Sequence, residues 1–119
     1  HIFLVMDVCF GGTFDDNANH RAAEDEIYSV ASQSDIIGRK LRFKTRKYLT
    51  SGGKEYVSDG IVGKHSPFAK QLLEALEKGM GRDGILTTAE ILAFVETLKT
   101  APQFGTFGSD QLGSDFVFV

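Results

Sequence analysis

The stretch LVMDVCFGG, Leu4–Gly12, decides the fold and contains the only cysteine of the chain. It completes the apolar run Ile2–Val8, a pattern typical of a strand that is buried on both faces. Cys9 follows the run directly, and Gly11 and Gly12 begin a loop. In open α/β sheets, chemistry takes place just beyond the carboxyl ends of strands. The stretch therefore predicts a thiol on the rim of a sheet.

The rest of the chain alternates between predicted helices and strands. Ser66 suits a helix N-cap and Pro67 the first helical position. Thr87 and Glu90 have the spacing of a capping box that starts another helix. The predicted elements are a weak helix at Gln33–Phe43, a strand at Lys47–Thr50, helices at Pro67–Lys78 and from Thr87 to near Thr100, and a strand in the tail DFVFV. This alternation predicts an α/β architecture with a mostly parallel sheet. It also places the loop from Ser51 to Gly63 on the same rim as Cys9.

Composition narrows the class of protein. A length of 119 residues suits one domain, and a net charge of -3 gives no basic field for nucleic acid. No apolar run approaches the roughly 20 residues that span a bilayer, so no membrane partner is expected. A single cysteine forms no internal disulfide, which fits a reducing compartment. We therefore expect a cytoplasmic location.

Asp7 bears on the role of Cys9. On an extended strand, residues two apart point to the same face, so the carboxylate and the thiol are expected side by side. A nearby negative charge raises a thiol pKa, so Asp7 does not activate Cys9. It would instead pair with a cationic substrate side chain, bidentately if that is arginine. The amides near Gly11 and Gly12 would stabilise an oxyanion. The alternatives are that Cys9 is a small buried hydrophobe and that Asp7 is a capped or salt-bridged structural residue.

A cysteine nucleophile at neutral pH needs a base, usually histidine. His1 precedes the first strand and should lie at the end far from Cys9. His20 lies in a loop, and His65 comes just before a helix cap; each reads more simply as a surface or loop histidine. The base is therefore expected outside this chain. The basic run Arg39–Lys47 is either a solvated face or an exposed processing site.

Five stretches of the sequence together resemble a known family. LVMDVCFGG, followed by YLTSGGKEYVSDG, HSPFAKQLLEAL, GILTTAEI and FGTFGSDQLGSDFVF, looks like the second half of a caspase-like cysteine peptidase domain. The similarity is to the bacterial branch near metacaspases and paracaspases. It covers nearly the whole chain and implies a three-layer α/β fold, of which residues 1–119 are the C-terminal portion. The family's histidine, in a His-Gly element, lies roughly 50 residues before the cysteine. The resemblance thus implies an upstream half, in the same precursor or a separate chain, that supplies the base.

The resemblance also implies residue roles. Cys9 would be the nucleophile, and its N–H, with an upstream glycine N–H, would hold the oxyanion. Asp7 would be an acid on the floor of the S1 pocket, as in the Asp-x-Cys pattern, which points to cleavage after Arg or Lys. Glu55 falls where paracaspases place a second S1 acid, and Asp59 is the alternative. Each of these two also reads as a solvated loop carboxylate.

Two further features come from the comparison with the family pattern. Gly11 stands where many relatives have serine in Asp-x-Cys-x-Ser-Gly, and this departure removes only a hydroxyl. Many metacaspases need calcium, for which Asp15 and Asp16 are candidate ligands. The sequence itself requires no cofactor.

Two hypotheses from different classes follow. The first is a cysteine endopeptidase that cuts peptide or protein substrates after Arg or Lys and processes itself within Arg39–Lys47. The second is a catalytically inactive caspase-like module with a regulatory or scaffolding role. A His-Gly element at the end of an upstream strand would favour the first hypothesis.

Overall fold

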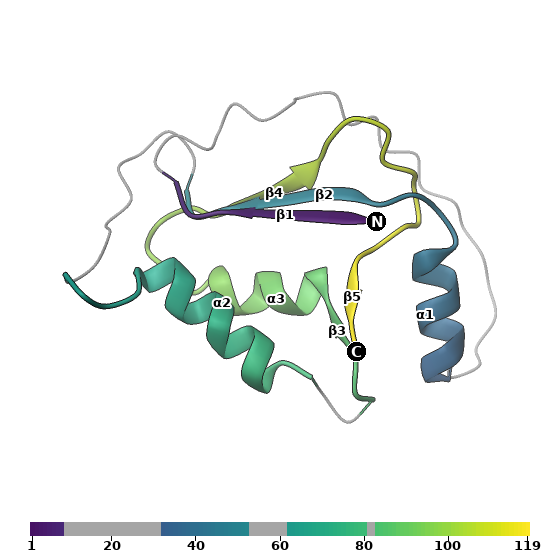
Figure 1. Cartoon of the computed structure of the whole chain (residues 1–119), viewed down its shortest axis with the longest axis horizontal. Helices are drawn as coiled ribbons and strands as arrows, with labels where there is room; N and C mark the ends of the chain where they lie inside the picture. Colours follow the sequence, from purple (N-terminus) through teal and green to yellow (C-terminus); the bar gives the residue numbers. More distant parts are fainter. Residues whose placement is uncertain (9–31, 53–61, 81–82) are drawn as a thin grey trace.

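The computed structural model describes residues 1–8, 32–52, 62–80 and 83–119, which form a small α/β fold (Figure 1). The elements are β1 (Ile2–Met6), α1 (Gln33–Leu41), β2 (Arg46–Thr50), α2 (Pro67–Lys78), β3 (Leu86–Thr87), α3 (Thr88–Val95), β4 (Gln103–Thr106) and β5 (Val117–Phe118). No helix within these segments is long and apolar enough to cross a membrane.

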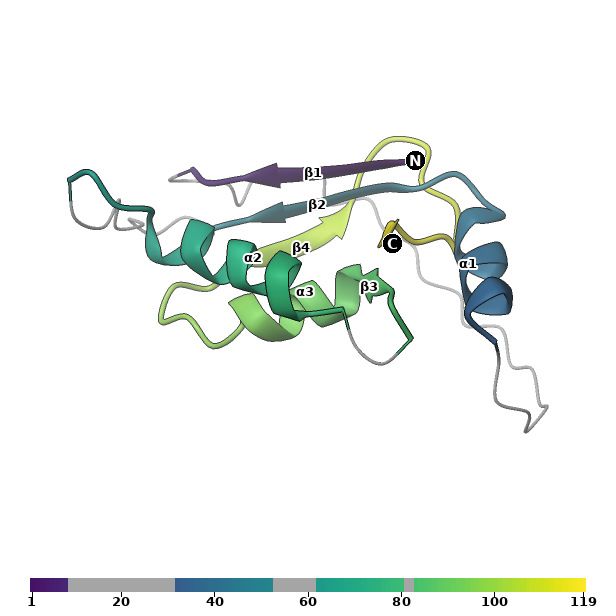
Figure 2. The ribbon, with the colours of Figure 1, turned by 60° about the horizontal axis from the view of Figure 1, so that its bottom comes forward.

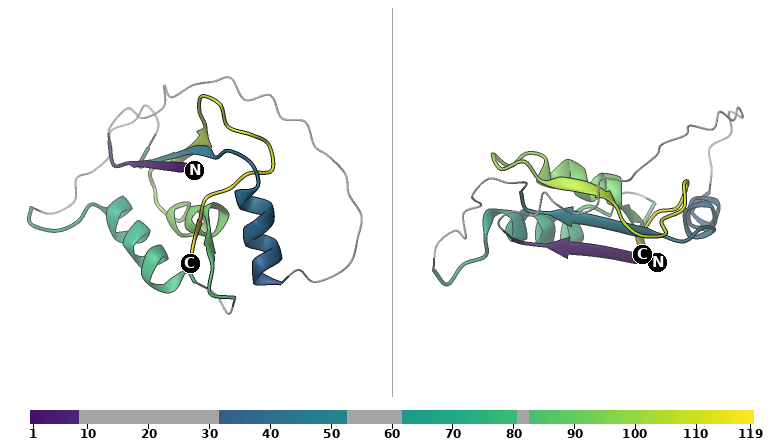
Figure 3. Two further views of the ribbon diagram at one scale, coloured as in Figure 1. Left: turned by 45° about the vertical axis from the view of Figure 1, so that its right-hand side comes forward. Right: turned by 90° about the horizontal axis from the view of Figure 1, so that it is seen from above.

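The described strands form two sheets. The larger has the order β1-β2-β4, and β1 pairs in parallel with β2 so that Met6 lies opposite Thr50. β4 pairs antiparallel with β2, and β3 and β5 form a second, two-stranded antiparallel sheet. Figure 3 shows β1 along one edge of the larger sheet and α1 beyond its end.

The prediction of a mostly parallel sheet is wrong for the described strands, because β1–β2 is their only parallel pair. β4 was not predicted, since its sequence QFGT has a glycine at the centre and no run of apolar residues. Gly105 lies opposite Tyr48 and leaves room for its ring, because an added Cβ would be 2.8 Å from ring atoms of the tyrosine. The pairing of β4 with β2 therefore depends on packing between the two strands, which the spacing of apolar residues in the sequence does not reveal.

Two helices pack on one face of the larger sheet (Figure 2). Phe68 and Ala75 of α2 meet Ile91 and Val95 of α3, and these side chains surround Leu49 of β2. All five are at most 1% exposed. The side chains that pack around them alternate along the strands, as expected for a sheet with one face against helices; they include Phe3, Val5 and Phe104.

The predicted helix boundaries are confirmed at most ends. Ser66 is the N-cap of α2 with Pro67 in its first turn, and the helix ends at Lys78 as predicted. Thr87 and Glu90 form the predicted capping box of α3. The weak helix near Gln33–Phe43 is α1, which ends two residues earlier.

The end of α3 was predicted wrongly. The helix stops at Val95 and does not continue to the region of Thr100. The Leu98 N–H turns back to the Val95 carbonyl at 3.1 Å, and the Thr97 hydroxyl donates to the Phe94 carbonyl. These bonds close the last turn while Leu98 still packs against the core. The predicted helix was too long because it was judged from the spacing of apolar residues, and that spacing continues beyond the last helical hydrogen bond.

Candidate functional site

The carboxyl ends of β1 and β2 form one rim of the larger sheet. Because the two strands are parallel, the residues that follow Met6 and Thr50 leave the sheet at the same edge. The start of α2 lies on this side of the molecule as well (Figure 1). The rim was the predicted place for the chemistry, and three separate segments of the chain meet there.

Ser51 fixes the backbone that leads to Cys9. Its side chain is fully buried, and its hydroxyl accepts from the Val8 N–H at 3.0 Å and donates to the Val8 carbonyl at 3.1 Å. Its own N–H donates to the Met6 carbonyl at 3.0 Å. β1 therefore ends at Met6, short of the predicted Val8, because a serine side chain replaces the next rung of the ladder.

Asp7 lies on the rim with an exposed side chain. Its Oδ2 atom accepts a hydrogen bond of 2.5 Å from the Ser66 hydroxyl, which comes from the N-cap of α2. The same hydroxyl accepts from the Ala69 N–H at 3.0 Å. Within the described segments, Asp7 forms no ion pair. Ser66 thus holds the carboxylate in place, and no cation among the described residues pairs with it.

The remaining predicted rim residues lie outside the described residues. These are Cys9, Gly11, Gly12, Asp15, Asp16, His20, Glu55 and Asp59. The structure therefore joins Asp7 to Ser66 and joins the neighbouring Val8 to Ser51. It leaves the positions of the predicted nucleophile, the second acid and the calcium ligands as predictions.

Two of the three histidines are described. His1 lies at the opposite end of β1, as the sequence predicted. Its Nδ1 is 2.9 Å from the Thr45 hydroxyl oxygen. His65 precedes Ser66 and is exposed, beside a shallow depression along the outer side of α2. In the described ranges, no three His, Cys, Asp or Glu side chains are grouped so as to hold a metal ion.

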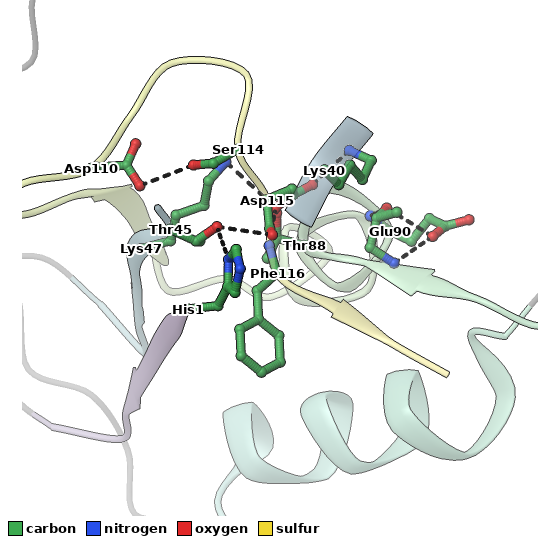
Figure 4. Close-up of polar contacts among 11 residues, drawn as sticks. His1, Lys40, Thr45, Lys47, Thr88, Glu90, Asp110, Ser114, Asp115 and Phe116 are labelled. Carbon is green, nitrogen blue, oxygen red and sulfur yellow. Dashed lines mark hydrogen bonds and ion pairs between the residues drawn. The ribbon is translucent and has the colours of Figure 1, made fainter. Parts of the chain in front are cut away.

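A second polar cluster lies at the other end of the sheet (Figure 4). Asp115, 5% exposed, accepts from Lys40 Nζ at 2.7 Å and from the Thr88 hydroxyl, and Lys47 Nζ lies 3.5 Å away. Its backbone carbonyl accepts from the Thr45 hydroxyl at 2.9 Å. The cluster joins the C-terminal segment to α1, β2 and α3.

The charge state of Asp115 follows from these contacts. Burial alone would raise its pKa, but the hydrogen bonds from Lys40 and Thr88 and the charge of Lys47 outweigh burial, so that the pKa of Asp115 is lowered. The acid is therefore ionised and fully paired, which is a structural arrangement. Sequence reasoning missed Asp115, although an acid directly before the apolar tail FVFV was a signal for it.

The serines of the rim were missed as well. Ser66 was predicted as a helix cap, but its bond to Asp7 joins residues 59 positions apart and has no local signature. Ser51 was placed only in a loop. Comparison with protein-family models, with curated proteins and with solved structures gives no match for this chain.

Proposed function

We propose that this protein is a cysteine endopeptidase of the caspase-like superfamily that cleaves after Arg or Lys. The observation that carries the proposal is the exposed Asp7 carboxylate, two positions before the only cysteine and held by Ser66 at the carboxyl end of β1. Asp7 is not needed as a helix cap, because Ser66 itself caps α2. A held carboxylate that forms no ion pair with the described residues, two positions before a cysteine, suits recognition of a positively charged substrate side chain.

The proposed reaction proceeds through an acyl-enzyme. A histidine from the upstream half takes the proton of the Cys9 thiol, and the sulfur attacks the scissile carbonyl carbon. The N–H of Cys9 and an upstream glycine N–H hold the oxyanion. When the intermediate collapses, the leaving amine takes the proton from the histidine, and water then hydrolyses the thioester. Asp7, with Glu55 or Asp59, binds the substrate cation throughout.

The upstream half is the proposed partner. Among the described strands, β1 pairs only with β2, and Ile2 is 45% exposed although it begins an apolar strand. Strands from the upstream half would pair with this edge and supply the His-Gly element. Its helices would cover the sheet face opposite α2 and α3, which completes the three-layer arrangement implied by the family resemblance.

Replacement of Asp7 tests the proposal. In the complete protein, Asp7→Asn keeps the shape of the side chain and removes its charge. We expect kcat/KM for a peptidyl-Arg substrate to fall about 100-fold, the cost of leaving a bound cation without its partner. The matched control is Glu96→Gln, which removes a charge from an exposed residue just beyond α3. Its turnover should equal that of the wild type.

The same experiment separates the protease from an inactive scaffold. Turnover of peptidyl-Arg substrates by the wild type that is lost in Cys9→Ala supports the proposal. Wild-type protein without turnover, combined with an upstream sequence that has no His-Gly element, would instead favour a regulatory module. Unchanged turnover in Asp7→Asn would remove Asp7 from the pocket.

A further inference from the structure

We propose that Ser66 is a positioning residue that orients the Asp7 carboxylate and so sets a preference for arginine over lysine. This inference rests on the proposed function. It assigns to the N-cap of α2 a second role, toward the substrate, that the capping of a helix does not require.

The geometry leaves the Ser66 hydroxyl no freedom. A serine hydroxyl has one proton to donate and two lone pairs that accept. The Ala69 N–H occupies a lone pair at 3.0 Å, and the proton is directed to Asp7 Oδ2 at 2.5 Å. Ser66 is only 9% exposed, so the surrounding side chains hold its rotamer. The hydroxyl is thus fixed by α2 and in turn fixes the carboxylate.

The orientation of the Asp7 carboxylate matters more for binding an arginine guanidinium than for binding a lysine ammonium group. An arginine guanidinium is planar and binds a carboxylate through two parallel hydrogen bonds, which requires the two planes to be aligned. A lysine ammonium is a compact charge with rotatable donors and tolerates other orientations. Only one oxygen of Asp7 is used by Ser66, and the described residues place no hydrogen bond on Oδ1. Loss of Ser66 should therefore weaken arginine substrates more than lysine substrates.

Ser66→Gly removes the donor and largely keeps the cap, because glycine is tolerated at N-cap positions at a small cost. Ser66→Thr retains both the donor and the cap. The matched control is Ser32→Gly, since Ser32 caps α1 and its hydroxyl donates to Asp35 at 2.5 Å, a carboxylate of its own helix. Thermal unfolding establishes that each variant is folded.

The experiment measures kcat and KM of the complete protein on peptidyl-Arg and peptidyl-Lys substrates of equal sequence, with the rate of Cys9 alkylation by iodoacetamide. In Ser66→Gly we expect KM for the Arg substrate to rise about tenfold, that for the Lys substrate about twofold, and kcat to change little. Alkylation should be unchanged. Ser66→Thr should restore the wild-type ratio, and Ser32→Gly should not alter it.

Several results would overturn the inference. If the wild type is active and the ratio of Arg to Lys turnover is unchanged in Ser66→Gly, Ser66 does not set the preference for arginine. The proposed function would stand in that case. An equal loss on both substrates together with a lower temperature of thermal unfolding shows that the serine acts only on stability. Wild-type protein that turns over neither substrate removes the proposed function and this inference with it.

Discussion

At the scale of single residues, two serine hydroxyls organise the rim by using their proton and a lone pair at once. Ser51 bonds both backbone groups of Val8, and Ser66 joins Asp7 to the first turn of α2. Each hydroxyl is therefore held in one rotamer. Ser51 fixes the Val8 peptide, which precedes Cys9 in the sequence, and Ser66 fixes the carboxylate of Asp7.

Ser51→Ala should therefore affect the proposed nucleophile Cys9 and leave the proposed preference for basic substrates unchanged. The substitution leaves the Val8 N–H and carbonyl without these partners, and it should lower the free energy of unfolding by about 1–3 kcal/mol, measured by urea denaturation. It should also reduce kcat, with the KM for Arg substrates little changed. A raised KM at constant kcat would contradict the separate roles of the two serines.

The lowered pKa of Asp115 leads us to expect that the stability of the fold depends on pH. Its pKa in the folded protein lies below the ordinary value of 3.8, so its ionised form stabilises the fold at pH values above about 4. That contribution is lost as the pH falls through the lowered pKa. At pH 7, Asp115→Asn should cost about 2–3 kcal/mol, because Lys40 and Lys47 lose their partner.

Urea unfolding of the wild type and Asp115→Asn between pH 7 and pH 3 tests this account. The difference between the two proteins should shrink as the pH drops below about 4. A difference that stays constant over this range would show that Asp115 acts through its shape and not through its charge.

At the scale of elements, local signals predicted the helices better than the strands. Ser66 and Pro67 start α2, and Thr87 with Glu90 starts α3, because capping is decided by residues within one turn. β4 depends instead on the fit of Gly105 against Tyr48 of another strand. Contacts of this kind join distant parts of the chain, so a sequence pattern does not display them.

Gly105→Ala should therefore be destabilising. The added Cβ would lie 2.7 Å from the Tyr48 hydroxyl oxygen and 2.8 Å from its ring, so the tyrosine side chain must leave its position on the sheet, at a cost of about 1–3 kcal/mol. Gly38→Ala is the matched control, because nothing lies within 4 Å of its added Cβ in α1. This control should raise stability by up to about 1 kcal/mol. Equal effects of the two alanines in urea denaturation would refute the packing argument.

At the scale of the whole molecule, the two ends of the larger sheet have different chemistry. The rim carries an exposed Asp7 that forms no ion pair with the part of the chain that the structure describes, whereas the opposite end carries Asp115, which is buried and paired. The sequence indicated Asp7 as a candidate site residue, because an acid two positions before a lone cysteine is unusual in an apolar strand. It did not predict Ser51 and Ser66 as partners, since their contacts depend on how three segments meet.

The fold also reduces the number of bonds within Arg39–Lys47 at which the proposed self-processing would take place. Within Arg39–Lys47, Lys40 and Lys47 bind Asp115, and the Arg46 guanidinium donates to the Thr45 carbonyl at 2.8 Å. Arg39 lies within α1, whereas the exposed Arg42 is the C-cap of the helix and the exposed Lys44 lies beyond it. Both backbone groups of Lys44 are hydrogen-bonded to Gln111, whereas Arg42 lies at the end of a helix, where the chain opens most easily. We therefore expect the bond after Arg42 to be cleaved first.

Mass spectrometry of the complete protein after incubation tests this prediction. Arg42→Gln should abolish the first cleavage, and Arg39→Gln should leave it unchanged. Cys9→Ala should prevent all processing. Cleavage that persists in Cys9→Ala would assign the cut to another protease.

The most direct test of the central claim is covalent labelling of Cys9 in the complete protein by a peptidyl-Arg chloromethyl ketone. The account predicts that Asp7→Asn slows this labelling about 100-fold. Reaction with uncharged iodoacetamide should stay equal or become faster, because removal of a negative charge lowers the thiol pKa. Labelling by the peptidyl-Arg reagent that is no faster than by a neutral analogue, or that is unaffected by Asp7→Asn, would contradict the claim.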